Sequence, residues 1–139
     1  MLFRSLNIMS IFNNHSAEIL VLLFLIITFL QSGIDKITDW KGNVDFITGH
    51  FKNSPLQKMA PLLLLTVLIF EIAASVLMLI GGYYLFTEGD GTVAKVGLEF
   101  AAITLIMLLI GQRLAKDYAG AMSLAVYFIL TIFGIFLLN

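Results

Sequence analysis

The stretch PLLLLTVLIFEIAASVLMLIGG, residues 61–82, decides the fold class. As a helix rising about 1.5 Å per residue it would reach about 33 Å, and the hydrocarbon core of a bilayer is about 30 Å thick. Its single ionisable residue, Glu71, lies near its middle. A carboxylate at that depth costs several kcal/mol unless it is protonated, paired or hydrated. The stretch predicts a membrane-spanning helix, with Glu71 as its candidate functional residue.

The composition supports a chain that is surrounded mostly by lipid. Of its 139 residues 60% are hydrophobic and 12% are charged, whereas a soluble domain is about half apolar and a quarter charged. A net charge of -1 does not favour nucleic-acid binding. The chain has no cysteine, which excludes disulfides, thiolate nucleophiles and iron–sulfur clusters within these residues.

Three further apolar runs are long enough to cross a bilayer, so we expect an all-α, up-down bundle of four transmembrane helices. Short connections after the second and third helices force antiparallel neighbours. Between the first two helices, Val44, Ile47 and Phe51 share one helical face, and Trp40 precedes Lys41. This pattern predicts a short interfacial helix over Asn43–Lys52. The expected spans, within one transmembrane domain of residues 1–139, are about 17–37, 61–86, 93–115 and 121–138.

The distribution of lysine and arginine predicts the orientation of the bundle. Of the eight such residues, only Arg4 and Lys95 fall on the side of the termini. The positive-inside rule therefore places the first and third connections in the cytoplasm and both termini on the periplasmic side. We expect Met1–Ser16 to be retained as a short N-terminal segment whose apolar residues rest on the membrane surface. Those apolar residues are Leu2, Phe3, Leu6, Met9 and Ile11.

A polar pocket is expected between the first two spanning helices, around Glu71. In one interpretation Glu71 is a protonatable group that lines a cavity and accepts a hydrogen bond from a quinone or another head group. In the other it is a structural carboxyl bonded to a tyrosine, serine or lysine of a neighbouring helix. The expected members of the pocket are Glu71, Gln31, Asp35, Lys36, Ser75 and Tyr127.

The expected partners of Glu71 are Gln31 or Asp35 on the first helix and Tyr127 on the fourth. If Asp35 is the partner, the two carboxyl groups should share a proton, since like charges at close range do not both ionise. The alternative is that Asp35 and Lys36 only mark the headgroup boundary, where a lysine extends its ammonium group toward water.

Charged residues also gather at the end of the third helix. Arg113, Lys116 and Asp117 are predicted to form a cytoplasmic cluster that, together with Asp35, binds an anionic head group or a partner subunit. The alternative is ordinary positive-inside charge. On the opposite side of the membrane, Glu99 is expected to pair with Lys95 in a structural role.

The remaining chemistry of the chain is sparse. No predicted span contains a histidine, so the bis-histidine haem site of membrane cytochromes is not available. His50 and Asp45 are too few ligands for a zinc site. The sequence has no phosphate-binding loop, catalytic triad or HExxH motif, and no metal site or catalytic residue is assigned.

Two short patterns resemble the DoxX-like family of small four-helix bacterial membrane proteins, over about Ala17–Leu138. They are FLQSGIDKITDW at residues 29–40 and EIAASVLMLIG at residues 71–81. Members carry a Gly-x-x-Lys at the end of the first helix and a Glu followed by small residues in the second. The corresponding residues here are Gly33, Lys36, Glu71, Ala74 and Gly81.

The resemblance implies a multi-pass protein of the bacterial inner membrane. The family name comes from subunits of a thiosulfate:quinone oxidoreductase, and other members are linked to redox complexes. The first hypothesis is therefore an accessory or scaffold subunit of a larger, redox-linked membrane complex. The alternatives are a quinone- or lipid-binding subunit centred on Glu71 and a small transporter or proton path.

Overall fold

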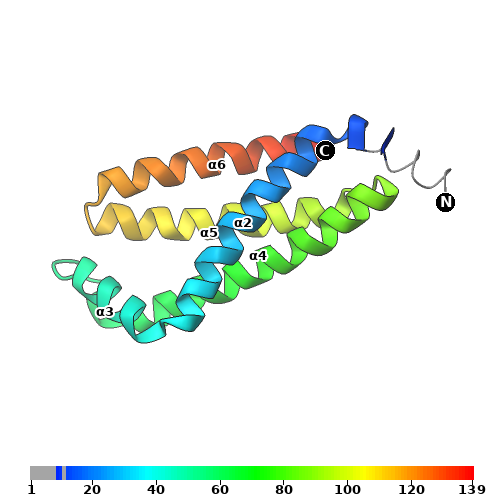
Figure 1. Cartoon of the computed structure of the whole chain (residues 1–139). Coiled ribbons are helices and arrows are strands. Elements are labelled where there is room, and N and C mark those ends of the chain that lie inside the picture. Colours follow the sequence, from blue (N-terminus) through cyan, green and yellow to red (C-terminus); the bar gives the residue numbers. More distant parts are fainter. Residues whose placement is uncertain (1–8, 11) are drawn as a thin grey trace.

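A computed structural model describes residues 9–10 and 12–139, and this part of the chain is helical without strands (Figure 1). The all-α prediction is confirmed. Arg4 and most of the apolar residues of the N-terminal segment lie outside the described residues, and Met9, which is described, is exposed. The elements are α2 (Ser16–Thr38), α3 (Trp40–His50), η1 (Gln57–Met59), α4 (Ala60–Glu88), α5 (Thr92–Leu114) and α6 (Tyr118–Leu138).

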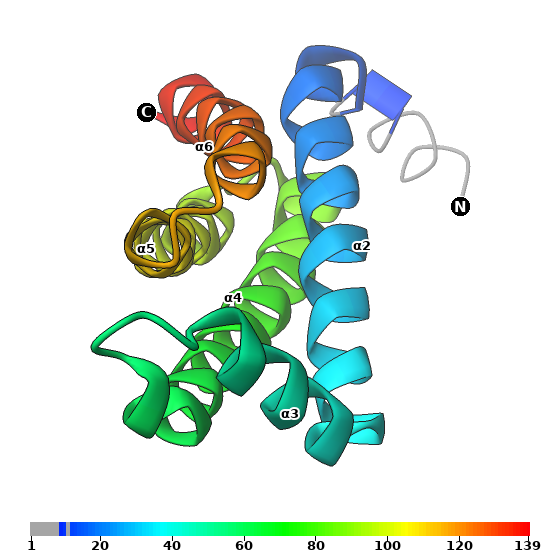
Figure 2. The same ribbon diagram turned by 90° about the vertical axis from the view of Figure 1, so that its left-hand side faces the viewer.

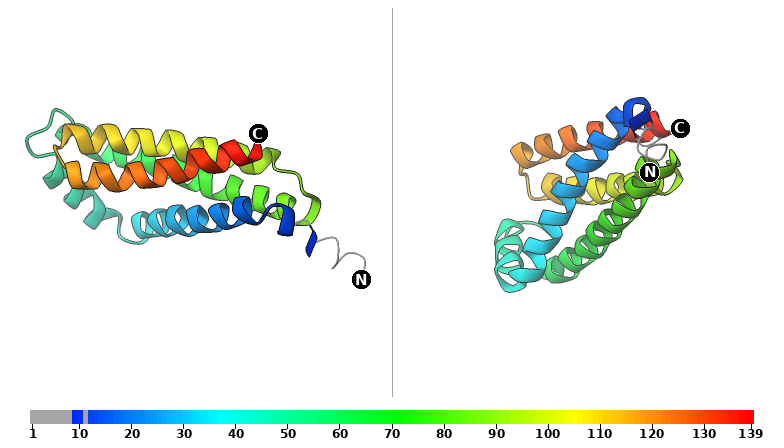
Figure 3. Two further views of the ribbon diagram at one scale, coloured as in Figure 1. Left: turned by 90° about the horizontal axis from the view of Figure 1, so that it is seen from above. Right: turned by 45° about the vertical axis from the view of Figure 1, so that its right-hand side comes forward.

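Four of these helices, α2, α4, α5 and α6, are long and apolar enough to cross a membrane. They pack in a ring in which each helix contacts the next and α6 returns to α2 (Figure 2). The chain runs up and down through the ring. The start of α2 and the end of α6 therefore lie at one end of the bundle, and α3 lies at the other with the α5–α6 turn (Figures 1 and 3). The predicted four-helix bundle is confirmed, and we call these the terminal end and the α3 end.

The tightest packing joins α4 to α5 near the terminal end. A Cβ atom on Gly81 would collide with the backbone of Ala94, and one on Gly97 would lie 2.8 Å from the backbone nitrogen of Met78. Small residues in these places let two helix backbones approach closely, which is how helices associate in lipid. Ala94 and Met78 are fully buried in this seam.

Polar residues set the ends of the helices. The carboxylate of Asp39 accepts a hydrogen bond from the backbone N–H of Gly42 (3.2 Å) and caps α3. Asp117 caps α6 in the same way through Gly120 (2.9 Å). Both bonds satisfy an N–H that has no partner inside the helix. The cap at Asp39 begins α3 three residues before the predicted Asn43, so that α3 follows α2 almost without a break.

Candidate functional site

A buried ion pair joins α2 to α4. The Lys36 ammonium lies 3.1 and 3.2 Å from the two carboxylate oxygens of Glu71. The hydroxyl of Ser32 accepts a hydrogen bond from Lys36 (2.6 Å) and donates one to Glu71 (3.2 Å). The side chain of Glu71 is only 2% exposed and that of Lys36 only 12%. The expectation that Glu71 faces the interior rather than lipid is confirmed, because its carboxylate is fully bonded inside the bundle.

Helical spacing explains this arrangement. Ser32 and Lys36 are four residues apart and share one face of α2, and that face meets α4 at Glu71. Ser75 is buried, but its hydroxyl donates to the backbone carbonyl of Glu71 (2.8 Å) and not to the carboxylate. The hydroxyl of Ser75 is therefore hydrogen-bonded within α4 and does not contact the ion pair.

The named partners of Glu71, which were Gln31, Asp35 and Tyr127, were wrong, whereas the alternative of a serine or lysine on a neighbouring helix is confirmed. Gln31 and Asp35 are exposed on the outer side of α2, and the carboxylate bonds to Lys36 and Ser32 instead. The polar residues from Thr28 to Lys36 are spread over a wide angle around α2, because successive residues are about 100° apart. Only Ser32 and Lys36 among them bond to Glu71 on α4. Tyr127 is half-buried on α6 and packs its ring 6.3 Å from that of Phe24.

An apolar cavity of about 430 Å³ lies beside the ion pair, between α3, α4 and the last turns of α5. It is a partly open cavity, and α3 lies beside the place where α4 and α5 separate (Figure 2). Lys36 forms part of its wall, so the ion pair and the cavity belong to one site. The other lining residues are Asn43, Phe46, Ile47, His50, Phe51, Leu56, Leu63, Leu64, Thr66, Val67, Met107, Leu108, Ile110, Gly111, Gln112 and Leu114.

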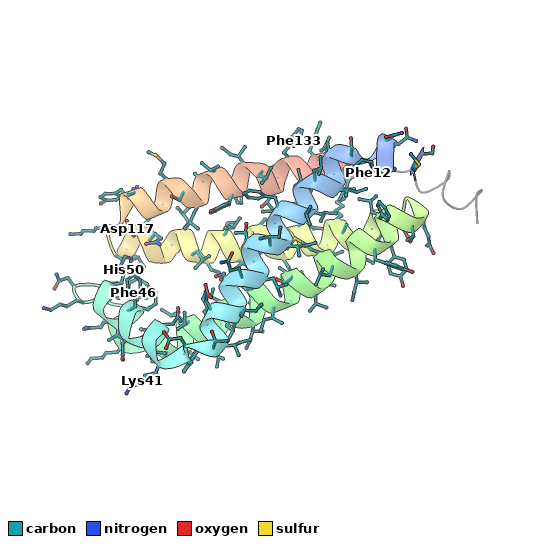
Figure 4. All side chains as sticks on the ribbon, viewed as in Figure 1. Phe12, Lys41, Phe46, His50, Asp117 and Phe133 are labelled. Atoms are coloured by element: carbon teal, nitrogen blue, oxygen red, sulfur yellow. The ribbon has the colours of Figure 1, made fainter. Side chains whose placement is uncertain are left out.

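His50 links α3 to the end of α5 and to the α5–α6 turn at the edge of this cavity. Its Nε2 lies 3.0 Å from Oε1 of Gln112 and 3.5 Å from Oδ2 of Asp117. Its ring stacks on Phe46 of the preceding turn, with the centroids 5.7 Å apart (Figure 4). From the sequence, His50 was interpreted only as a possible metal ligand. Its spacing from Phe46 and Ile47, which places all three on adjacent faces of α3, was the available signal.

The charged residues predicted to cluster after α5 make separate contacts instead. The guanidinium of Arg113 lies over the ring of Tyr118, 4.9 Å from its centroid, and Lys116 turns the chain with a positive φ of 61°. Asp117 caps α6 and faces His50. Asp35 remains on α2. Within residues 12–139, no ion pair joins Asp35 to this turn, because the two lie on different faces of the α3 end.

Glu99 has no protein partner in the described part of the chain. It is exposed on the outer face of α5, and the pair expected with Lys95 is not formed there. A lysine placed four residues before a glutamate is the less favourable order on a helix, since both side chains lean toward the N-terminus. The carboxylate of Glu99 is therefore directed out of the bundle.

Within the described ranges, no group of three His, Asp or Glu residues is close enough to hold a metal ion. The site instead combines a buried lysine–glutamate pair with a partly open apolar cavity.

Comparison with known proteins identifies the chain by its family. The family model described as DoxX matches residues 19–112, which is more than half of the chain. The matched range contains both members of the Lys36–Glu71 pair, the whole of α3 and most of the cavity lining. No curated protein and no solved structure matched the chain. The extent of the family match, with the four apolar helices, shows that this multi-pass membrane protein belongs to the DoxX family.

Proposed function

We propose that this protein binds an amphiphilic membrane molecule, a quinone or a lipid, in the cavity between α3, α4 and α5. The observation that carries the proposal is the cavity itself. Its volume of about 430 Å³ lies within the range of about 300–1,000 Å³ that is typical of small-molecule sites. A bundle of four helices has no packing need for such a space, because closing it would gain dispersion contacts.

The polar groups of the cavity are suited to a head group. The Gln112 amide in the lining is a hydrogen-bond donor, and the Lys36 ammonium, which is bonded to Glu71 and Ser32, brings a positive charge to the cavity wall. The amide nitrogen of Asn43 donates to the backbone carbonyls of Asp35 and Asp39. The rest of the lining is almost entirely aliphatic and aromatic. A molecule with carbonyl or phosphate oxygens and a long apolar tail satisfies both parts.

Fluorescence of the single tryptophan, Trp40, gives a direct test. Trp40 begins α3, three residues before Asn43 in the cavity lining. In lipid nanodiscs, a ubiquinone with one isoprenoid unit should quench Trp40 saturably. Val67→Phe places a ring in the cavity, and Leu65→Phe places the same ring on the lipid-facing side of α4. Quenching should be lost in the first variant and kept in the second, and equal quenching in both would overturn the proposal.

The same assay with a doxyl-labelled phosphatidylglycerol distinguishes a lipid from a quinone. The probe whose quenching saturates at the lower concentration, and is abolished by Val67→Phe, identifies the class of ligand. Glu71→Leu removes the counter-ion of Lys36 and should weaken binding about tenfold or more by disturbing the ammonium group. Unchanged binding in Glu71→Leu would confine the site to the apolar cavity and remove the ion pair from the proposal.

A second candidate role, as an accessory subunit of a larger membrane complex, is favoured by Glu99. A carboxylate on the outer face of a spanning helix has only hydrocarbon around it unless another protein covers it. A helix that presents a lysine or arginine at the same depth would satisfy it. Native mass measurement after mild solubilisation should show a co-purifying protein that is lost on Glu99→Leu. A preparation without any such protein would contradict this role.

We also propose that the α3 end faces the cytoplasm of a bacterial inner membrane. Lys36, Lys41, Arg113 and their neighbours gather at this end, and Lys95 lies near the other. The positive-inside rule then assigns both termini to the periplasm. A reporter fused after Asn139 should be active only when it is periplasmic, and cytoplasmic activity would reverse the orientation.

A further inference from the structure

Gln31 is a polar side chain on the lipid-facing side of α2. It is exposed, and in the described part of the chain no hydrogen bond reaches its amide. α2 spans residues 16–38, so its midpoint is Ile27, and Gln31 lies only about 6 Å from that midpoint by helical rise. With α2 centred in a hydrocarbon core about 30 Å thick, the amide lies inside that core.

An unpaired amide is costly at this depth. The amide is neutral, but its N–H donors and its carbonyl acceptor need hydrogen-bond partners, and its side chain is too short to reach the headgroup region. Thr28, which is also on α2, shows the contrast, because its hydroxyl donates to the carbonyl of Phe24 (2.9 Å) and is satisfied within its own helix. The Gln31 amide requires a partner from outside the chain.

We propose that this partner is a second copy of the same chain, which packs its α2 against the first along a seam of Ile27, Gln31 and Ile34. Both copies have the same orientation in the membrane, so a two-fold axis along the membrane normal brings Gln31 opposite Gln31 at one depth. An amide carries both donors and an acceptor, so two of them form a reciprocal pair. No complementary group has to be supplied by another protein.

The residues around Gln31 fit such a seam. Ile27 and Ile34 are 56% and 49% exposed and lie on the same outer face of α2. Asp35 is turned about 80° from Ile27 and about 40° from Gln31 around the helix axis. It lies about one turn beyond Gln31 toward the headgroups, so its charge is at the edge of the contact. The seam does not include the cavity, which is lined from α2 only by Lys36, and the two proposals can fail separately.

The natural absence of cysteine makes cross-linking a clean test. Single variants Ile27→Cys and Ile34→Cys place a thiol in the seam, whereas Ile69→Cys on α4 and Ile129→Cys on α6 place one on other lipid-facing surfaces. A disulfide forms only where Cβ atoms approach to about 4 Å. Mild oxidation in vesicles should give a dimer of twice the chain mass for the seam positions and little or none for the controls.

A second set of variants tests the amide itself. Adding Gln31→Leu to the Ile27→Cys chain should weaken dimerisation about tenfold, as expected for the loss of an interhelical hydrogen-bonded pair. Thr28→Val, whose hydroxyl is already satisfied, should leave it unchanged. Gln31→Leu makes the lipid-facing surface more apolar, so retained helical circular dichroism will separate loss of the contact from loss of folding.

Three results would overturn the proposal. Equal cross-linking at Ile69→Cys or Ile129→Cys would indicate random collision, and a cross-linked product of another mass would assign the seam to a different protein. Dimerisation that Gln31→Leu does not change would show that the amide is not part of the contact.

Discussion

The α4–α5 seam at the terminal end and the site at the α3 end show two ways in which helices meet in one small bundle. In the seam, Gly81 faces Ala94 and Gly97 faces Met78, so that backbones are nearly in contact. At the α3 end, α4 and α5 separate, and a partly open apolar cavity lies between them, with α3 forming part of its wall. The only charged pair buried in a span, Lys36–Glu71 within the described residues, is at this looser end.

The contrast supports the proposal that the α4–α5 seam stabilises the bundle and that the α3 end binds the ligand. Close packing of small residues gives van der Waals contact over a long stretch, which is the main source of helix association in lipid. The α3 end has less of this contact, and there polar groups lie next to the apolar cavity. A part of a protein that is less well packed than the rest is where ligand binding is expected. The two ends should therefore respond differently to similar changes.

The largest effect is expected for Lys36→Met at the α3 end. It leaves the Glu71 carboxylate buried without a counter-ion, which should cost about 3–5 kcal/mol of unfolding free energy. Thermal unfolding in detergent micelles, followed by circular dichroism, measures the loss. The double variant Lys36→Met/Glu71→Leu should recover most of it, and Lys41→Met, at an exposed position, serves as the control. A single variant as stable as the wild type would show that the pair does not hold α2 to α4.

Gly81→Ala should be the most damaging small change in the seam. The added methyl group meets the backbone of Ala94, which no rotamer change can relieve, and the helices must move apart at a cost of about 1–3 kcal/mol. Gly82→Ala is the matched control, because nothing lies within 4 Å of its Cβ position. Alanine there should be neutral or slightly stabilising. Equal effects at the two positions would contradict the close approach of α4 and α5.

Val67→Phe should be tolerated at the α3 end although it adds far more volume than Gly81→Ala. Its ring enters the cavity, so stability should stay the same or rise by about 0.5–1 kcal/mol. The same unfolding measurement applies, with Leu65→Phe as the lipid-facing comparison. A loss of more than about 2 kcal/mol would mean that the cavity is not available space.

The smallest effect is expected at Asp90, in the turn between α4 and α5. Hydrogen bonds from the backbone N–H and hydroxyl of Thr92 hold the pKa of the Asp90 carboxyl below its usual range. A lowered pKa means that the carboxylate stabilises the fold above its ordinary pKa and ceases to do so as the pH falls through the lowered value. Asp90→Ala should slightly lower the unfolding temperature at pH 7, and the difference should vanish in acid. A difference that persists in acid would assign the effect to something other than the charge.

Much of the fold was predictable from composition and run length, since only helices about 20 residues long satisfy their backbone groups in hydrocarbon. The existence of α3 followed from the spacing of Val44, Ile47 and Phe51. The inward position of Glu71 followed from the cost of leaving a carboxylate in lipid. The partner of Glu71 could not be predicted, because the stripe from Thr28 to Lys36 is polar over a wide angle and a rotation of α2 by a fraction of a turn exchanges Asp35 for Lys36.

The sequence by itself therefore determined the number of spans, their up-down order and the burial of Glu71, because these depend on the free energy of placing each residue in lipid or in protein. Only the tertiary structure decided that Lys36 and Ser32 face Glu71, that Gln31 and Glu99 face outward, and that α3 forms part of the wall of a cavity. In a membrane both faces of a helix are apolar, so hydropathy does not reveal which face packs inward. That choice depends on the shapes of the facing helices, and the close approach at Gly81 and Gly97 is one of the contacts that set it.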